Sequence, residues 1–303
     1  MAHLLCFICS KLRYWVSKTK MCSGKMLITT QPLVQHMEKV AALHLRRQIE
    51  ACRCLRPHEE FIDSLAGGGV AAITKADYTR KLNHTTGFGM DGPVTSIDLA
   101  LIQSISTRKG VTPEIDLCSL AHPTALQVLT SSCWTVNGFL NAYAYALHDL
   151  DYSASGVTSD IQIHKAQEDQ MEDFVRSSVQ GFKDGGRPLD LLCLLAESAA
   201  NRKDTTIYLA TQNGVIIGSG GMAVIDTDIG PIAHLHIDST LPSWRGRGVH
   251  AALIHARIQD ARECGCVLAT LETRPGSGSS RNAERMGFKL AYTKSTFTPS
   301  NRE

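Results

Sequence analysis

The chain has little excess charge of either sign, few aromatic residues and no long apolar run. Its formal net charge is +2 over 303 residues, so the composition points to no polyanionic partner. Aromatic residues make up 6% of the chain, and its lysines and arginines are spread out, so we predict no nucleic-acid-binding face. No apolar stretch is long enough to cross a bilayer, and we expect a cytoplasmic protein without a membrane partner.

The ten cysteines lack the spacing of a metal site. Three close pairs occur, and none is followed by a second cysteine or histidine pair at a usual zinc spacing. These pairs are Cys6/Cys9, Cys52/Cys54 and Cys264/Cys266. We therefore expect free thiols in a reducing compartment and no bound metal.

Residues 1–28 predict no folded element. The apolar letters "LLCFIC" are too few for a signal core, and no basic region precedes them. Five lysines or arginines and no acid up to Met37 are also typical of an organelle presequence. We favour a disordered leader.

The remaining residues, of which many are apolar, are expected to form a globular protein with two halves, 29–150 and 161–303. The polar, turn-rich stretch 151–160 between them is the predicted linker. Each half ends in the order helix, glycine, strand, helix, strand, so the halves are interpreted as divergent copies of one α/β unit. In the second half, Asn213 and Gly214 predict a tight β-hairpin turn.

The stretch "LPSWRGRGVHAALIHARIQDARECGC", 241–266, is present in the second half alone. A predicted strand precedes this stretch, and an amphipathic helix follows the glycines. The first peptide N–H groups of such a helix have no partner within the helix, and they lie at the positive end of the helix dipole. Gly246 and Gly248 let the backbone approach an anion, and Arg245 and Arg247 add charge. The turn predicts a phosphate cradle, and a solvated loop is the plainer alternative.

A second glycine pattern, "IIGSGGMA" at 216–223, matches a dinucleotide-binding fingerprint with Asp238 near the ribose-binding position. That fingerprint requires a helix after the glycines. The residues that follow have the pattern of a β-strand, so we disfavour a dinucleotide site here.

The segments "RGRGVHAALIHARIQDARECGC" and "PGSGSSRNAERMGFKLAYTK" together resemble the coenzyme A-binding half of the GCN5-related N-acetyltransferase (GNAT) superfamily. The resemblance is strong over 160–297 and weaker over 30–150, which is similar to the degenerate first half of tandem GNAT proteins. It implies two tandem GNAT-like domains, each a mixed central sheet flanked by helices, with acetyl-CoA as co-substrate. The positions that it implies for coenzyme binding are Ile237, Arg245, Gly246, Arg247, Gly248, Val249, His250, Ser279 and Asn282.

Two positions depart from the family pattern. His250 stands where a final glycine or alanine is usual and adds bulk near the phosphates. Ala283 stands where a tyrosine often protonates the departing thiolate. Tyr292, on the next strand, can replace that tyrosine only if it points into the cleft, and we favour a packed strand tyrosine.

Acyl transfer to an amine also needs a base. In "AHLHIDST", His234, His236 and Asp238 alternate with apolar residues, which places all three ionisable groups on one face of a predicted strand. A histidine can take up a proton near neutral pH. We predict that these three residues form the catalytic set, and that His236 or Asp238 is the base.

The predicted function is acyl-CoA-dependent N-acetyltransfer to an amine, or to a hydroxyl, of a small molecule by direct attack in a ternary complex. The segment 180–206 is expected to cover the acceptor cleft, but it does not identify the acceptor. A CoA-binding protein without turnover and a GNAT-like enzyme with a non-transfer reaction are the alternatives. A homodimer is left open.

Overall fold

The computed structural model describes residues 29–147 and 160–300. The predicted leader, 1–28, and nearly all of the predicted linker, 151–160, lie outside the described residues. Of the described helices, none has both the length and the apolarity that crossing a bilayer requires.

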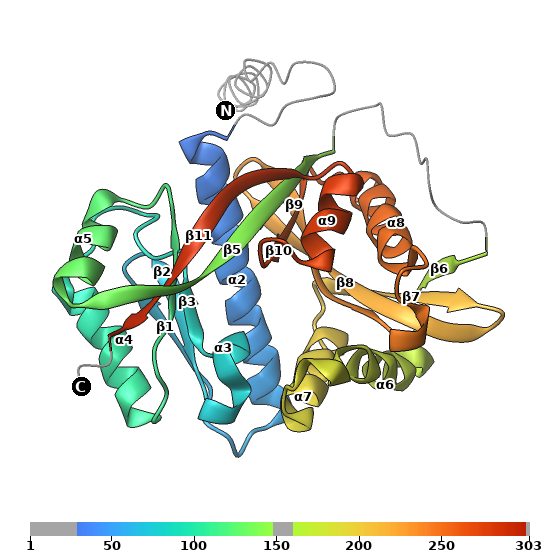
Figure 1. Cartoon of the computed structure of the whole chain (residues 1–303), viewed down its shortest axis with the longest axis horizontal. Coiled ribbons are helices and arrows are strands. Elements are labelled where there is room, and N and C mark those ends of the chain that lie inside the picture. Colours follow the sequence, from blue (N-terminus) through green and yellow to red (C-terminus); the bar gives the residue numbers. More distant parts are fainter. Residues whose placement is uncertain (1–28, 148–159, 301–303) are drawn as a thin grey trace, which may run out of the picture.

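The described strands form one continuous mixed sheet in the order β1-β2-β3-β4-β11-β5-β10-β9-β8-β7-β6 (Figure 1). The strands of the first half are β1 (Ile62–Ala66), β2 (Gly69–Ile73), β3 (His84–Thr86), β4 (Ile115–Cys118) and β5 (Trp134–Ala146). Those of the second half are β6 (Gln162–Lys165), β7 (Thr205–Gln212), β8 (Val215–Thr227), β9 (Gly230–Thr240), β10 (Leu268–Thr273) and β11 (Lys289–Pro299). The predicted class, a mixed sheet with flanking helices, is confirmed.

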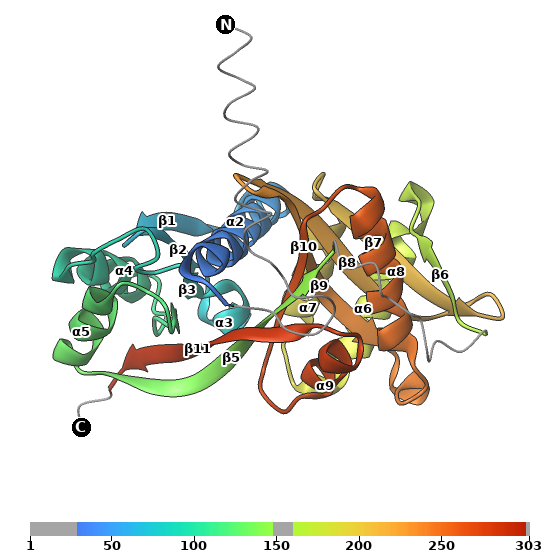
Figure 2. The same cartoon turned by 90° about the horizontal axis from the view of Figure 1, so that it is seen from above.

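The two long strands β5 and β11 are exchanged between the halves. β5 pairs antiparallel with β10 of the second half, and β11 pairs antiparallel with β4 of the first. The two also pair with each other along most of their length, so they cross the middle of the molecule as a ribbon (Figures 1 and 2). Each half therefore depends on a strand from the other.

The helices of the first half are α2 (Gln31–Leu55), α3 (Thr79–Leu82), α4 (Ser96–Arg108) and α5 (Pro123–Ser131). The long helix α2 begins at Gln31, because the Thr30 side chain accepts a hydrogen bond from the N–H of Leu33 and a proline occupies the first turn. It runs between the halves and packs on β2 on one side and on β8 and α7 on the other. A helix of the first half thus forms part of the core of the second.

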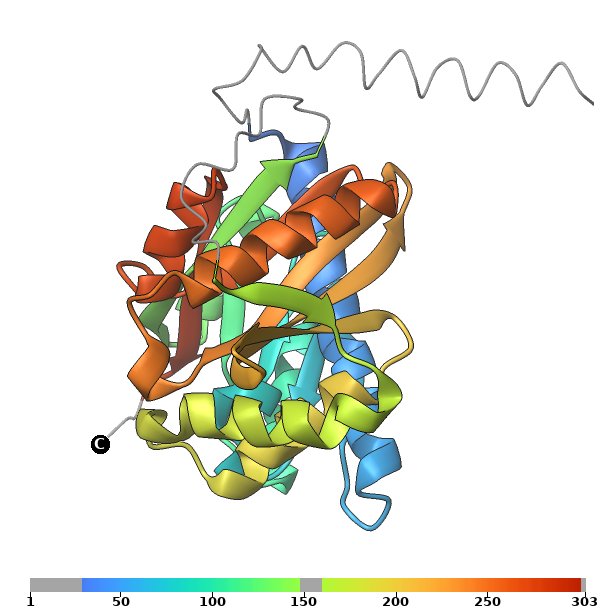
Figure 3. The ribbon, with the colours of Figure 1, turned by 90° about the vertical axis from the view of Figure 1, so that its right-hand side faces the viewer.

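The helices of the second half are α6 (Met171–Phe182), α7 (Leu189–Ala200), α8 (Val249–Glu263) and α9 (Gly278–Arg285). They cover opposite faces of the same strands: Leu235 and Tyr208 pack in the core under α8, while Ile207 and Leu209 pack with Phe174 of α6. Figure 3 shows α8 lying across the sheet above α6. Helix α7 was not predicted, because its apolar residues extend around most of the helix.

The hairpin between β7 and β8 was predicted correctly. Asn213 and Gly214 both have positive φ angles, of 51° and 76°, as a two-residue turn of this kind requires. The turn leads the chain into β8, the neighbour of the strand on which the predicted catalytic residues lie.

Candidate functional site

The predicted phosphate cradle connects β9 to α8. Residues 245–248 are exposed, and Gly246 and Gly248 adopt φ angles of 75° and 85° that favour glycine. Gly248 is the N-terminal cap of α8 and has no side chain to satisfy the first N–H groups of the helix. This end of α8 has the geometry of an anion site.

The two arginines of the turn already have contacts within the protein. The guanidinium of Arg245 donates to the Asp184 carboxylate at 3.0 Å and to the carbonyl of Gly181 at 2.9 Å, which ties the turn to the end of α6. The guanidinium of Arg247 lies 4.8 Å from the ring centroid of Trp244. The backbone of the turn is therefore more available to a ligand than the Arg245 side chain.

β9 carries a bulge at Ile237. Ser219 of β8 pairs with Ser239 and Gly221 pairs with His236, so two residues of β9 lie opposite one residue of β8. Ile237 has a φ of 53°, which is unusual for a β-branched residue. Strain of this kind persists where the surrounding structure enforces it, and it is concentrated at functional sites.

Beside the bulge, β9 and β10 part. Their parallel pairing covers Leu268–Ile232, Ala269–Ala233 and Thr270–His234, and no strand of the described residues pairs with β9 on that side beyond His234. Both strands nevertheless continue, to Thr240 and Thr273. The gap leaves an edge of β9 open to hydrogen bonding with a ligand.

His234 and His236 lie on the sheet face that α2 covers. The ring centroid of His44, from α2, is 4.6 Å from that of His234 and 4.5 Å from that of His236. Burial is the main cause that lowers the pKa of all three imidazoles, and for His234 the value falls to about 4. The Nε2 atom of His236 is buried without a hydrogen-bond partner in the described structure. These rings are therefore neutral at pH 7.

The prediction that Asp238 shares this face is wrong. The extra residue of the bulge reverses the alternation, and the Asp238 carboxylate instead pairs with the fully buried guanidinium of Arg257 on α8. An oxygen of the Asp238 carboxylate also lies 3.6 Å from Nε2 of His250. Neither His44 nor Arg257 was predicted, because nothing local in the sequence indicates which helix covers which face of the sheet.

The second helix of the predicted coenzyme site lies beside the first. Asn282 of α9 contacts His250 of α8, with 3.0 Å between the amide nitrogen and Nδ1, and Ser279 is exposed in the first turn of α9. Ala283 is buried in the core under α8. Tyr292 is a packed strand tyrosine, as favoured, and donates a 2.6 Å hydrogen bond to the Glu38 carboxylate.

The glycine pattern at 216–223 forms part of strand β8, so the disfavoured dinucleotide site is excluded. These glycines provide room for neighbouring groups. A Cβ atom at Gly220 would lie 2.8 Å from an Asp238 oxygen, and one at Gly221 would lie 3.0 Å from Nε2 of His236. The glycines of β8 are thus required by the bulged strand beside it.

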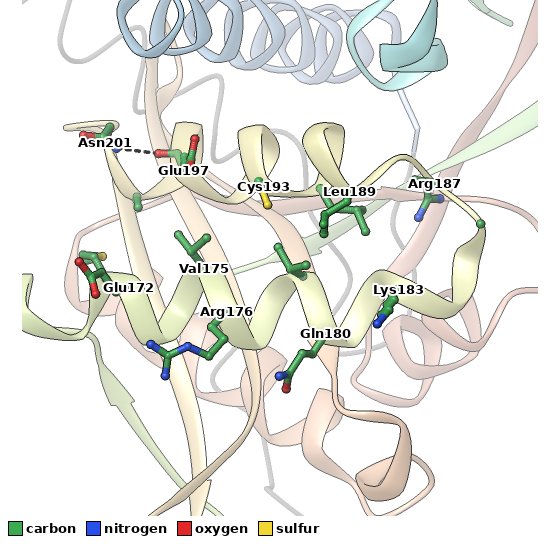
Figure 4. Close-up of a pocket in the computed structure, with 15 residues that line it drawn as sticks. Glu172, Val175, Arg176, Gln180, Lys183, Arg187, Leu189, Cys193, Glu197 and Asn201 are labelled. Atoms are coloured by element: carbon green, nitrogen blue, oxygen red, sulfur yellow. Dashed lines mark hydrogen bonds between the residues drawn. The ribbon is translucent and has the colours of Figure 1, made fainter.

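The segment 180–206 contains the end of α6, a short 3₁₀ turn at Lys183–Gly185 and α7. A groove of about 890 Å³ runs between α6 and α7, with apolar side chains such as Val175 and Leu192 along its length (Figure 4). Whether this segment covers an acceptor cleft stays a prediction.

No group of three or more histidines, cysteines or acids in the described ranges has the arrangement of a metal site. Among the cysteines, Cys52, Cys118 and Cys266 are buried, and burial raises their pKa values to about 12, 12 and 11. Such thiols are poor nucleophiles at neutral pH.

Residues 165–288 match the family model described as the acetyltransferase (GNAT) family. No curated protein matches the sequence. A GCN5-related N-acetyltransferase from Kribbella flavida has a similar structure, with a TM-score of 0.60 and 17% identity over 87% of this chain and 96% of that chain. A conserved protein of unknown function from Staphylococcus epidermidis ATCC 12228 gives a TM-score of 0.54 and 13% identity, over 80% of this chain and 95% of that one.

A GCN5-related N-acetyltransferase from Sphaerobacter thermophilus gives a TM-score of 0.53 and 13% identity, over 79% of this chain and 82% of that one. At these identities the likeness concerns the fold. These structures cover between 79% and 87% of this chain, which is more than either half contains, so the likeness extends across both halves. The family match assigns residues 165–288, within the second half, to the acetyltransferase (GNAT) family, and the structural likeness shows that both halves share the fold of these GCN5-related N-acetyltransferases.

Proposed function

We propose that the protein transfers an acetyl group from acetyl-CoA to an amine of a small molecule, in a ternary complex and without a covalent enzyme intermediate. One observation carries the proposal: β9 and β10 part at a strained bulge, directly before an uncapped glycine turn at the start of α8. An open strand edge that is followed directly by a helix N-terminus suits a ligand that has both an amide-containing arm and a pyrophosphate.

The donor is bound mainly by backbone groups in this proposal. The N–H groups of residues 246–250 hold the pyrophosphate, and the open edge of β9 around Ile237 holds the pantetheine arm. Ser279 and Asn282 of α9 line the other side of this coenzyme site. The Arg257 guanidinium, buried between Asp238 and the Gly221 carbonyl, fixes the bulge and so positions that edge.

The acceptor enters on the face of the sheet opposite to α8, where His234, His236 and His44 lie. Its amine attacks the thioester carbonyl, so a C–N bond forms and the C–S bond breaks. The neutral imidazole of His236, with its unpartnered Nε2, takes the proton from the acceptor nitrogen. Because Ala283 has no hydroxyl and the Tyr292 hydroxyl is bound to Glu38, that proton can return to the departing thiolate from His236.

The test combines calorimetric titration of acetyl-CoA with a free-thiol assay over a panel of amines. We expect acetyl-CoA to bind, and His236→Asn to reduce turnover at least about 100-fold with acetyl-CoA affinity unchanged. His164→Asn, a change at an exposed histidine on β6, is the matched control and should keep full activity.

Absence of acetyl-CoA binding would refute the proposal. Binding without turnover on any amine would instead favour the CoA-binding protein without enzymatic activity. Full activity of the His236→Asn variant would remove His236 as the base.

A further inference from the structure

The sheet face that carries His234 and His236, which we call the histidine face, is covered by a residue from outside the matched family region. His44 belongs to α2, in the first half, whereas the family model covers residues 165–288. Its half-buried imidazole has its ring centroid 4.6 Å from that of His234 and 4.5 Å from that of His236. The planes of the His44 and His236 rings meet at 66°, so these two rings pack edge to face.

A buried arginine fixes the tautomer of His44. Arg202 lies in the turn between α7 and β7, and its Nη1 is 3.1 Å from Nδ1 of His44 and 3.4 Å from the His44 carbonyl oxygen. Because a guanidinium can only donate, Nδ1 of His44 must accept this hydrogen bond, and the ring proton is on Nε2. His44 is therefore a neutral ring whose proton position is set by its neighbour.

Arg202 is itself held by a carboxylate. Its Nε and Nη2 donate to the two oxygens of Asp204 at 2.9 and 2.8 Å, and Arg47 of α2 donates to the same carboxylate at 2.7 Å. The Arg202 side chain is only 4% exposed. Although burial opposes it, the hydrogen bonds and charges of Arg202 and Arg47 lower the pKa of Asp204 to about 2, so this carboxylate stays charged at neutral pH. These contacts tie α2 of the first half to the turn before β7 of the second.

The His236 ring depends on its neighbours for its orientation. Its Nε2 is buried without a hydrogen-bond partner in the described structure, so no bond at that atom orients the ring. Towards β8, a Cβ atom at Gly221 would lie 3.0 Å from Nε2, which shows that the ring is close to the backbone there. Of its two aromatic neighbours, His44 is the closer, at 4.5 Å against 6.3 Å for His234. The contact with His44 therefore restricts the His236 ring most directly.

We propose that His44 is a positioning residue for acyl transfer: fixed by Arg202, it holds the His236 imidazole in the orientation in which that ring takes the proton of the acceptor. This inference rests on the proposed function. A base works efficiently only when its rotamer is fixed by the groups packed around it, because a small displacement from the reacting atoms lowers the rate steeply. The first half of the chain thereby completes the catalytic site of the second.

The first experiment observes the histidines directly and does not depend on catalysis. NMR spectra of the full chain with isotope-labelled histidine report which ring nitrogen carries the proton, and His44→Gln assigns the signals of His44. From pH 8 to pH 6 we expect His44 to stay neutral with its proton on Nε2, and Arg202→Met should lose this preference for one tautomer. A wild-type His44 with its proton on Nδ1, or the same tautomer in Arg202→Met, would overturn the role of Arg202.

The second experiment separates positioning from packing by the split between kcat and KM. His44→Ala removes the ring, so kcat should fall at least about 10-fold while KM for acetyl-CoA stays within about 2-fold. His44→Phe restores a flat ring against His236 and should recover most of kcat. His58→Ala, at an exposed histidine beyond the end of α2, is the matched control and should keep full activity. Equal Tm values for the two His44 variants would show that their difference in kcat is not a difference in folding.

The outcomes separate this inference from the proposed function. If acetyl-CoA is bound and turned over but His44→Ala keeps the wild-type kcat, or if His44→Phe is no more active than His44→Ala, the inference fails and the proposed function stands. If NMR finds the expected tautomer but no amine is acetylated, the proposed function fails, and with it the catalytic role of His44, whereas the contact between Arg202 and His44 stands.

Discussion

Lys294 is the buried cation that connects the exchanged strand β11 to both halves. Its ammonium lies 2.7 Å from Glu38 of α2 and 2.7 Å from Glu272 of β10, and the side chains of Lys294 and Glu38 are 0% exposed. Lys294→Met keeps most of the side-chain volume but leaves the Glu38 carboxylate buried without its cation. Removing one partner of a buried ion pair costs about 3–5 kcal/mol of unfolding free energy.

Urea denaturation at pH 7 measures this loss, and a thermal scan should show a fall in Tm of about 10 °C. Lys289→Met, at the exposed start of the same strand, is the matched control and should change the unfolding free energy by less than about 0.5 kcal/mol. Adding Glu38→Gln to Lys294→Met removes the unpaired charge, so the double variant should recover about 1–3 kcal/mol.

The pH dependence gives a further check. Burial raises the pKa of Glu38, against the opposing charge of Lys294, and the loss of that charge raises it more. The loss of unfolding free energy caused by Lys294→Met should therefore become smaller as the pH falls from 7 toward 5, because a protonated carboxyl costs less free energy to bury than a charged one. A penalty below about 1 kcal/mol at pH 7, or no recovery in the double variant, would refute this account of the ion cluster.

Three further predictions concern β9 and its neighbours. Gly220→Ala should lower the unfolding free energy by about 1–3 kcal/mol, because its Cβ would meet Asp238, whereas Gly138→Ala has room and should be nearly neutral in the same urea titration. The lowered pKa of His234, about 4 against about 6.5 when unfolded, predicts a stability that is complete above pH 6.5 and falls by up to about 1.4 kcal/mol per pH unit between 6.5 and 4. His234→Gln should flatten that profile, and an unchanged profile would contradict the neutral imidazole. Gly248→Ala places a side chain at a φ of 85° and should cost about 1–2 kcal/mol in chemical denaturation; no loss would mean that the turn is not held in this conformation.

The local elements were predictable because each depends on nearby residues. Thr30 and Pro32 mark the start of α2, Asn213–Gly214 marks a hairpin, and the turn before α8 shows in its two glycines. Helix and strand periodicity carry such signals over short distances.

The features that sequence could not predict are set by partners far along the chain. Pairing of β5 with β10 and of β11 with β4 joins segments more than 100 residues apart, and no local pattern specifies it. The bulge at Ile237 inserts one residue and so places Asp238 beside Arg257, although simple alternation predicts otherwise. His44 reaches the histidine face only because α2 of the first half packs on the second. The predicted domain boundaries and site roles stay predictions.

The most direct test of the account is a crystal structure of the protein with CoA bound. We expect the pyrophosphate to lie within about 3 Å of backbone N–H groups of residues 246–250. We expect the pantetheine arm to lie along β9 beside Ile237, in the gap that opens beyond the Thr270–His234 pair. CoA bound elsewhere on the molecule, or a turn before α8 that remains empty at saturating CoA, would contradict the central claim.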